Sequence, residues 1–198
     1  MRIQELHVIS TGKQSPEELI SIVKQIHPYI DYIHLREKTW TVSQLEETID
    51  SFIAAEVPQG KIVVNTNAET AYKKAVAGVQ LTHRSIGVAK ARHLYSGLRI
   101  GCSVHSIDEA TAAEADGADY LFYGHIFESG SKPGVESRGL VGLREVVQST
   151  SIPVMAIGGI TPENARDVMA SGAAGVAVLS GILLADDPLV AVRRYDIR

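Results

Sequence analysis

The chain has 198 residues, about the length of one ordinary domain. Its residues are 45% hydrophobic and 21% charged, a composition that excludes a disordered or collagen-like chain. Nineteen basic residues against 23 acidic residues give a net charge of -4, so the charge expected of a nucleic-acid-binding protein is missing. We expect one globular domain over residues 1–198 and no nucleic-acid partner.

The single cysteine, Cys102, can form neither an internal disulfide nor a thiolate zinc cluster. No segment approaches the roughly 20 consecutive apolar residues that cross a bilayer, and the amino terminus does not have the pattern of a signal peptide. We therefore expect a cytoplasmic protein without a membrane partner.

Short apolar segments recur along the chain at regular intervals. Eight of them have the length and composition of β-strands, at residues 6–10, 32–35, 62–65, 79–81, 99–104, 120–124, 153–159 and 175–180. Units of about 25 residues are typical of parallel strands joined by helical crossovers. The pattern predicts an α/β protein with a (β/α)8 TIM barrel. The alternative, a doubly wound open sheet, lacks its usual glycine-rich turn after the first strand.

Four helix starts are marked by capping residues. Capping boxes occupy residues 15–18, 43–46 and 106–109, each with a serine three residues before a glutamate. Thr161 precedes Pro162, which suits the first position of a helix. We expect helices to begin at these four points, each after a predicted strand.

The active site of a (β/α)8 barrel lies at the carboxyl ends of its strands. In the second strand, alternation gives Tyr32, His34 and Arg36 the barrel-facing side. An inward arginine at the strand end suits an anionic ligand, whereas the alternative is a solvated charge cluster that continues to Lys38. Asn65 ends the third strand, where it either binds a ligand or caps the next helix.

Glycines follow the seventh and eighth predicted strands, at Gly158, Gly159 and Gly181. Glycine lets backbone N–H groups approach a phosphate closely, and a following helix start adds partial positive charge. These two strands are where barrels recurrently bind phosphate, so we expect a phosphate ester as ligand. The alternative is that the glycines serve tight turns only.

His125 follows the sixth strand and supplies an imidazole that can accept and return a proton near pH 7. His34, His83 and His105 also stand near strand ends, whereas His7 comes too early in its strand to reach the site. The loop after His125 offers hydroxyl and ammonium donors for an anion, at Ser129, Ser131 and Lys132. The carboxylates of Glu37 and Glu128 stand apart, so no metal site is expected.

Three motifs in this order resemble the thiamine phosphate synthase superfamily of small barrels, over nearly the whole chain. Residues 34–38 resemble its pyrimidine-side motif, residues 124–132 its thiazole-phosphate loop, and residues 157–160 with Leu179 and Ser180 its phosphate cradle. By this resemblance, a synthase carries an aspartate after the Asn65 position and an acidic motif after the fourth strand, which together hold magnesium. Here those places read Thr66 and residues 82–85, without a carboxylate.

The two missing carboxylates imply the TenI branch of the superfamily, the thiazole tautomerases. We therefore expect an isomerase of thiamine biosynthesis that shifts one proton in the ylidene form of carboxythiazole phosphate, without a cofactor or metal. His125 would carry the proton. The predicted substrate- and phosphate-binding residues are Arg36, Lys38, Asn65, Ser103, Ser129, Ser131, Lys132, Gly158, Gly159, Leu179, Ser180 and Gly181.

Two other functions stay open. One is a thiamine phosphate synthase, which joins pyrimidine pyrophosphate to thiazole phosphate and would recruit magnesium through Glu37 or Glu128. The other is a non-catalytic regulatory protein that binds a pathway metabolite. The pairing of two copies as a homodimer through the helices is also open.

Overall fold

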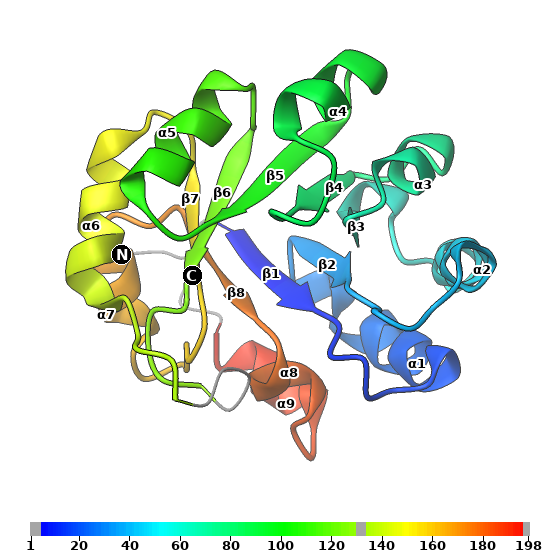
Figure 1. Cartoon of the computed structure of the whole chain (residues 1–198). Coiled ribbons are helices and arrows are strands. Elements are labelled where there is room, and N and C mark those ends of the chain that lie inside the picture. The colour runs from blue at the N-terminus through cyan, green and yellow to red at the C-terminus, as the bar shows by residue number, and fades with distance from the viewer. Residues whose placement is uncertain (1–4, 130–133, 196–198) are drawn as a thin grey trace.

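The computed structural model describes residues 5–129 and 134–195. Within these ranges, eight parallel strands pair in chain order, and the last pairs with the first to close a barrel (Figure 1). The strands are β1 (Glu5–Ile9), β2 (Tyr32–Leu35), β3 (Ile62–Asn65), β4 (Gly78–Leu81), β5 (Arg99–Val104), β6 (Tyr120–Gly124), β7 (Val154–Ile157) and β8 (Gly175–Val178). The predicted (β/α)8 barrel is confirmed.

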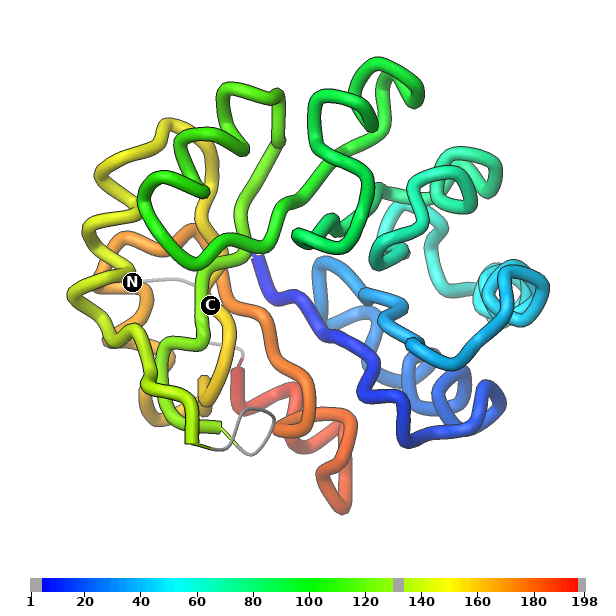
Figure 2. The backbone as a smooth tube through the Cα atoms, in the orientation of Figure 1, coloured from blue at the N-terminus to red at the C-terminus, as the bar shows by residue number. Residues whose placement is uncertain are grey.

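The helices lie outside the strands, and the backbone trace in Figure 2 follows them around the barrel in chain order. They are α1 (Pro16–Ile26), α2 (Val42–Ala54), α3 (Ala68–Lys73), α4 (Val88–Leu94), α5 (Ile107–Ala115), α6 (Gly139–Ser149), α7 (Ala165–Ala170), α8 (Ser180–Leu183) and α9 (Pro188–Arg193), with short 3-10 turns η1 (His27–Tyr29) and η2 (Gln59–Lys61). In the described part of the chain, no helix has the length and apolar composition to cross a membrane.

Two of the predicted helix starts are confirmed. Ser15 caps α1 in a full capping box with Glu18, and the Ser106 hydroxyl accepts a hydrogen bond from the Glu109 N–H at the start of α5. The box predicted at residues 43–46 is wrong, because Thr41 caps α2 together with Gln44.

Trp40 and Leu45 occupy the two positions of a hydrophobic staple around the Thr41 cap, and both pack against the core.

The start predicted at Thr161 is also wrong, since α7 begins at Ala165. The Asn164 side chain accepts a hydrogen bond from the Thr161 N–H and closes a turn before the helix.

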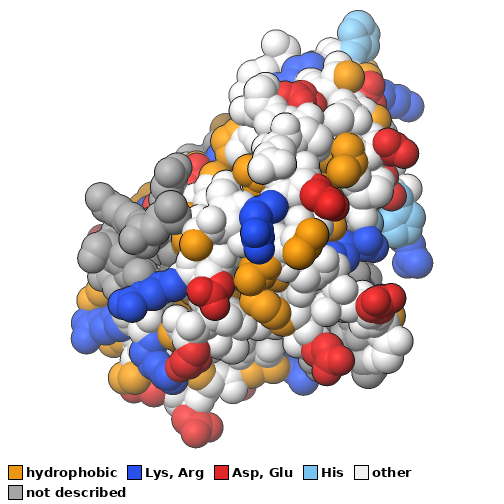
Figure 3. Space-filling model, turned by 90° about the vertical axis from the view of Figure 1, so that its left-hand side faces the viewer, with side chains coloured by type: hydrophobic (Ala, Val, Ile, Leu, Met, Phe, Trp, Pro, Cys, Tyr) orange, Lys and Arg blue, Asp and Glu red, His pale blue; other side chains and the backbone are white. Residues whose placement is uncertain are grey.

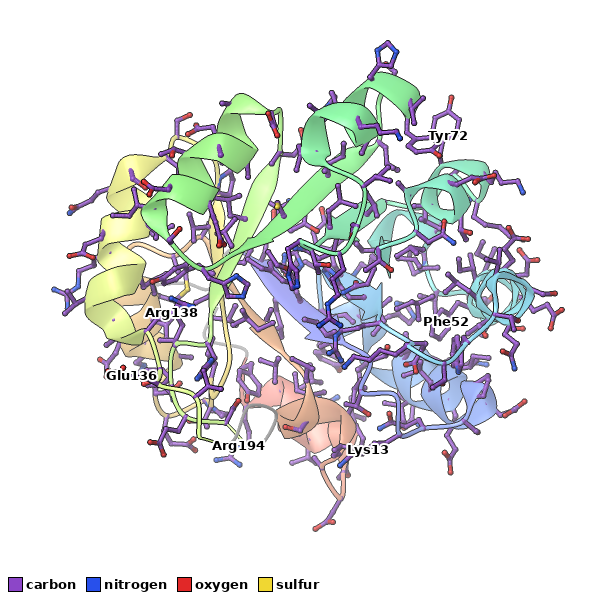
Figure 4. All side chains as sticks on the ribbon, in the orientation of Figure 1. Lys13, Phe52, Tyr72, Glu136, Arg138 and Arg194 are labelled. Atoms are coloured by element: carbon purple, nitrogen blue, oxygen red, sulfur yellow. The ribbon has the colours of Figure 1, made fainter. Side chains whose placement is uncertain are left out.

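The main core lies between the barrel and the helices. Phe52 points from α2 toward the strands and is fully buried, whereas Tyr72 projects from α3 away from the barrel and is 52% exposed (Figure 4). Burial of a large apolar side chain such as Phe52 contributes about 1.5–3 kcal/mol. This layer holds the helices against the strands whose ends carry the predicted site.

The barrel interior has an apolar half and a polar half. The apolar cluster comes mainly from β6, β7 and β8, with Phe122, Met155 and Ala177. Side chains from β1 to β5 make the other half polar: Glu5, His7, Tyr32, His34, Asn65, Gln80, Arg99 and Ser103. Gly101 gives these side chains room, because a Cβ there would lie 2.2 Å from the Tyr120 ring.

Candidate active site

The ends of β2 to β5 form the polar side of the barrel mouth. Leu35 pairs with Val64, so the next residues, Arg36 and Asn65, stand at the same level of the neighbouring strands. Strand alternation gives both the barrel-facing side. Ser103, from β5, accepts a hydrogen bond from the Gln80 amide at 3.0 Å. Three predicted binding residues, Arg36, Asn65 and Ser103, therefore belong to one group of adjacent strands.

Asn65 does not cap the next helix, which was one of its two predicted roles. The cap of α3 is Asn67, whose side chain accepts a hydrogen bond from the Thr70 N–H. Asn65 instead meets His34, with 3.3 Å between the Asn65 Oδ1 and the His34 Nδ1. Asn65 is half-buried at the end of β3, so the other end of its amide can reach a ligand at the mouth.

Behind Asn65, a row of hydrogen-bonded side chains follows the barrel axis. The His34 Nε2 lies 2.8 Å from the His7 Nδ1, and the His7 Nε2 lies 3.0 Å from a Glu5 carboxylate oxygen. Both imidazoles are completely buried. We call Glu5, His7, His34 and Asn65 the axial chain. The sequence indicates that His7 comes too early in its strand to reach the site, yet the structure connects His7 to Asn65 through the His34 side chain.

Burial governs the protonation of the two histidines. It lowers the pKa of His7 below its ordinary value, although Glu5 acts in the opposite direction. Burial, reinforced by the neighbouring His7 and Arg99, lowers the pKa of His34 further. Both shifts favour neutral imidazoles near pH 7.

Glu5 lies at the amino end of the barrel and is held as a carboxylate. Burial acts to raise its pKa, but the hydrogen bond from His7 and the positive charge of Arg99 together lower it. The Arg99 guanidinium lies 3.0 Å from the carboxylate and stacks between the rings of Tyr32 and Tyr120, at 4.5 and 4.6 Å from their centroids. This pairing fixes one charged end of the axial chain.

The opposite side of the mouth is formed by backbone. His125 is buried beside Gly158, where a Cβ would lie only 2.2 Å from the His125 Cβ. The segment after β6 continues to pair with the end of β7, through hydrogen bonds from the Ile126 N–H to the Ile157 carbonyl and from the Phe127 N–H to the Gly158 carbonyl. Gly158 is thus required for close backbone packing, whatever it binds.

His125 holds the returning loop, since its ring Nε2 lies 3.1 Å from the carbonyl oxygen of Val135. Glu136 and Arg138 lie on the same returning segment (Figure 4), and the Arg138 guanidinium donates to the Gly124 carbonyl at 3.0 Å. Ser129, in the segment after β6, is half-buried. Ser131 and Lys132 lie outside the described residues.

The eighth strand ends earlier than predicted, at Val178, and α8 begins at Ser180. Leu179 is half-buried, whereas Ser180 and Gly181 are exposed in the first turn of this helix. Together with Gly158 and Gly159, they form the glycine-rich side of the mouth. Lys38 is exposed beyond β2.

The resemblance to synthases implies a magnesium ion, and the side chains at the corresponding places do not fit one. Thr66 is exposed, and its hydroxyl donates to the Asn65 carbonyl at 2.6 Å. After β4, His83 and Arg84 are exposed and contact each other. Within residues 5–129 and 134–195, no three histidine, cysteine, aspartate or glutamate side chains gather as a metal site.

A hollow of about 360 Å³ lies elsewhere, on the helix side of β6. It opens between α5 and α6 and is lined in part by Asp108, Tyr123 and Glu145. Figure 3 looks onto the left-hand side of the view in Figure 1 and shows acidic, basic and apolar side chains interspersed there. This hollow is not part of the predicted site.

Comparison with known proteins identifies relatives of the chain. The family model described as thiamine monophosphate synthase matches residues 6–182. A thiamine-phosphate synthase of Chlorobium luteolum is 36% identical over 191 residues, which cover 95% of this chain and 89% of that protein. One from Caldivirga maquilingensis is 44% identical over 134 residues, which cover 68% of this chain and 65% of that protein, slightly less than two thirds of its length.

The solved structure of a thiamine phosphate pyrophosphorylase from Pyrococcus furiosus has the same fold. It superposes with a TM-score of 0.82 and 30% sequence identity, and the match covers 97% of this chain and 93% of that one. These findings contradict the predicted thiazole tautomerase and isomerase, because the relatives are named as synthases. The missing carboxylates at Thr66 and in residues 82–85 were not a sufficient reason to assign the tautomerase branch.

Proposed function

We propose that this chain, which belongs to the thiamine monophosphate synthase family, is a thiamine-phosphate synthase, a transferase of thiamine biosynthesis. It would join a pyrimidine pyrophosphate to a thiazole phosphate and release pyrophosphate. The observation that carries this proposal is the two-sided mouth, with Arg36, Asn65 and Ser103 on one group of strands and the glycine turns after β7 and β8 on the other. Two sites suited to anions fit two phosphorylated substrates.

The arginine side would bind the pyrophosphate of the pyrimidine substrate. The guanidinium of Arg36, the ammonium of Lys38 and the amide of Asn65 can each donate hydrogen bonds to phosphate oxygens. Their donation strengthens as negative charge develops on the departing pyrophosphate, which lowers the barrier to its release. Ser103, near the end of β5, would orient the pyrimidine.

The glycine side would bind the phosphate of the thiazole substrate through backbone N–H groups. Gly158 and Gly159 have φ angles of +98° and +67°, a conformation that other residues rarely adopt and that brings backbone close to a ligand. Leu179, Ser180 and Gly181 would complete this side, with Ser129, Ser131 and Lys132 from the loop after β6. His125 would position this loop through Val135 rather than transfer a proton.

The test is release of pyrophosphate and formation of thiamine phosphate from the two substrates in magnesium-containing buffer. Arg36→Gln should lower kcat/KM by about 10- to 150-fold, because a hydrogen bond to a charged group contributes about 1.5–3 kcal/mol. Lys13→Gln removes a cation from the loop after β1 and should leave the rate within about twofold. No product with the native protein, or an equal loss in both variants, would overturn the proposal.

A further inference from the structure

The positions of the hydrogens in the axial chain decide which end of the Asn65 amide faces His34. With Glu5 ionised and both imidazoles neutral, the His7 Nε2–H donates to Glu5, so the His7 Nδ1 must accept a hydrogen bond. It accepts from the Nε2–H of His34, 2.8 Å away. The His34 Nδ1 then carries a lone pair, and only the NH2 end of Asn65 can donate to it. In this state the carbonyl oxygen of Asn65 faces the mouth.

The opposite arrangement needs one more proton. If the Asn65 Oδ1, 3.3 Å from the His34 Nδ1 in the structure, faces the ring, the His34 Nδ1 must carry a hydrogen to donate to it. The structure thus has Asn65 in the orientation that offers its NH2 group to an anion. The His34 Nε2 then accepts from the His7 Nδ1–H, and His7 still donates to Glu5 through Nε2. His7 therefore holds two protons and a positive charge beside the Glu5 carboxylate. In this state Asn65 turns its NH2 to the mouth.

The two states differ in what they offer a ligand. A carbonyl oxygen at Asn65 repels an anion, whereas an NH2 group donates to it. The guanidinium of Arg36 belongs to the neighbouring strand at the same level, so an anion there would meet two donors in the second state and one in the first. Anion binding therefore favours the state of the axial chain that holds the additional proton.

We propose that the axial chain couples the binding of a phosphate-like anion at Asn65 to the uptake of one proton. The proton enters from water at the His34 Nδ1 as the Asn65 amide turns, and the proton on the His34 Nε2 passes to the His7 Nδ1. The positive charge ends on His7, beside the carboxylate of Glu5. Glu5, His7 and His34 are thus positioning residues that act through Asn65. The inference rests on the proposed function only for the kind of ligand.

The surroundings of the axial chain suit this exchange. Arg99 from β5 acts on both Glu5 and His7, and Asp31 before β2 acts on His7. The hydroxyls of Tyr32 and Tyr120 feel the charges of Arg99 and Glu5. On its other side, β1 pairs with β8, which brings only Gly175 and Ala177.

Phe122 packs against both imidazoles, at 5.2 Å from the His7 ring and 5.0 Å from the His34 ring. Apart from the carboxylates of Glu5 and Asp31, these neighbours carry no acidic side chain or imidazole that could take the proton instead. Since burial favours neutral imidazoles near pH 7, the additional proton arrives with the anion.

The experiment titrates the native protein with sulfate at constant ionic strength between about pH 6 and pH 9, where sulfate itself takes up no proton. NMR of the labelled protein gives the affinity, and the imidazole nitrogen signals give the tautomers. Affinity should fall by up to about tenfold per pH unit once the free chain is neutral. Sulfate should move the proton of His34 from Nε2 to Nδ1 and convert His7 to imidazolium.

Two variants separate this coupling from a structural role. In His34→Gln, an amide that both donates and accepts replaces the imidazole, so Asn65 can turn without a proton and sulfate affinity should become independent of pH. In Glu5→Gln, the charge that stabilises protonated His7 is lost, and the pH dependence should shift to lower pH. Asp31→Asn is the graded comparison: Asp31 also acts on His7 but lies outside the axial chain, so its shift should have the same direction as that of Glu5→Gln and be smaller.

Three results would overturn the inference: no sulfate binding by the native protein, unchanged imidazole tautomers on binding, or the same pH dependence in His34→Gln as in the native protein. Failure of the synthase assay with proton-linked sulfate binding intact would refute the proposed function alone. A working synthase whose sulfate affinity does not vary with pH would refute the coupling alone.

Discussion

Gly158→Ala tests whether the mouth depends on close packing of backbone between β6 and β7. The φ angle of Gly158 is +98°, a conformation that costs a residue with a side chain about 1–3 kcal/mol. The new Cβ would lie 2.2 Å from the Cβ and 2.7 Å from the Cα of His125, so the segment after β6 must move. Overpacking of this kind costs about 1–3 kcal/mol more. We expect a total loss of about 2–6 kcal/mol.

The assay is urea and thermal unfolding, with Gly60→Ala as the matched control. Gly60 has nothing within 4 Å of its Cβ position, so that substitution should be neutral or slightly stabilising. A loss of about 2 kcal/mol or more lowers the Tm of a chain of this length by at least about 4 °C. If Gly158→Ala melts within about 1 °C of the native protein, the packing argument fails and a purely ligand-binding role of the glycine gains support.

Three further predictions concern the chemistry of individual side chains. Burial raises the pKa of the Cys102 thiol to about 11, so near pH 8 it should react with a thiol reagent at least about tenfold more slowly in the folded than in the unfolded protein; equal rates would contradict this. Thr41→Ala should lower the free energy of unfolding in urea by about 1 kcal/mol, and Ser43→Ala by less than half of that. The reverse ranking would mean that Ser43, not Thr41, caps α2. The folded state lowers the pKa of Glu5 below its ordinary 4.5, so its contribution to stability is complete above that pH and is lost as the pH falls through the folded-state pKa. Glu5→Gln should therefore destabilise the protein at neutral pH and have little effect in acid, and an equal loss at both pH values would refute this sign.

The strands could be predicted closely because apolar runs mark them directly. The segments predicted at residues 32–35, 62–65, 99–104 and 120–124 have the bounds that the structure gives to β2, β3, β5 and β6. The last strand was predicted too long, because the apolar run continues into α8 at Ser180 and periodicity alone does not separate a strand end from a short helix. Helix caps were less predictable, since Thr41 and Ser43 both precede a glutamine or glutamate by three residues.

The prediction named polar residues at the ends of β2, β3 and β5 and missed the side chains behind them in the barrel. Arg36 and Asn65 could be selected because alternation and strand order give both the same face and level. The functional assignment failed for a different reason. The prediction relied on two absent carboxylates, whereas relatives that match nearly the whole chain are named as thiamine-phosphate synthase or pyrophosphorylase.

The part of the axial chain behind Asn65 could not be predicted, because its hydrogen bonds join residues 27 and 31 positions apart through the barrel interior. The available signal was parity: Glu5 and His7 alternate in β1 as Tyr32 and His34 do in β2, which assigns all four to the inside. Four polar side chains inside a closed barrel need partners within the barrel, since burial of unpaired polar groups is costly. That requirement links the end of the barrel remote from the ligand to the mouth, so a residue far from the strand ends can still influence the site.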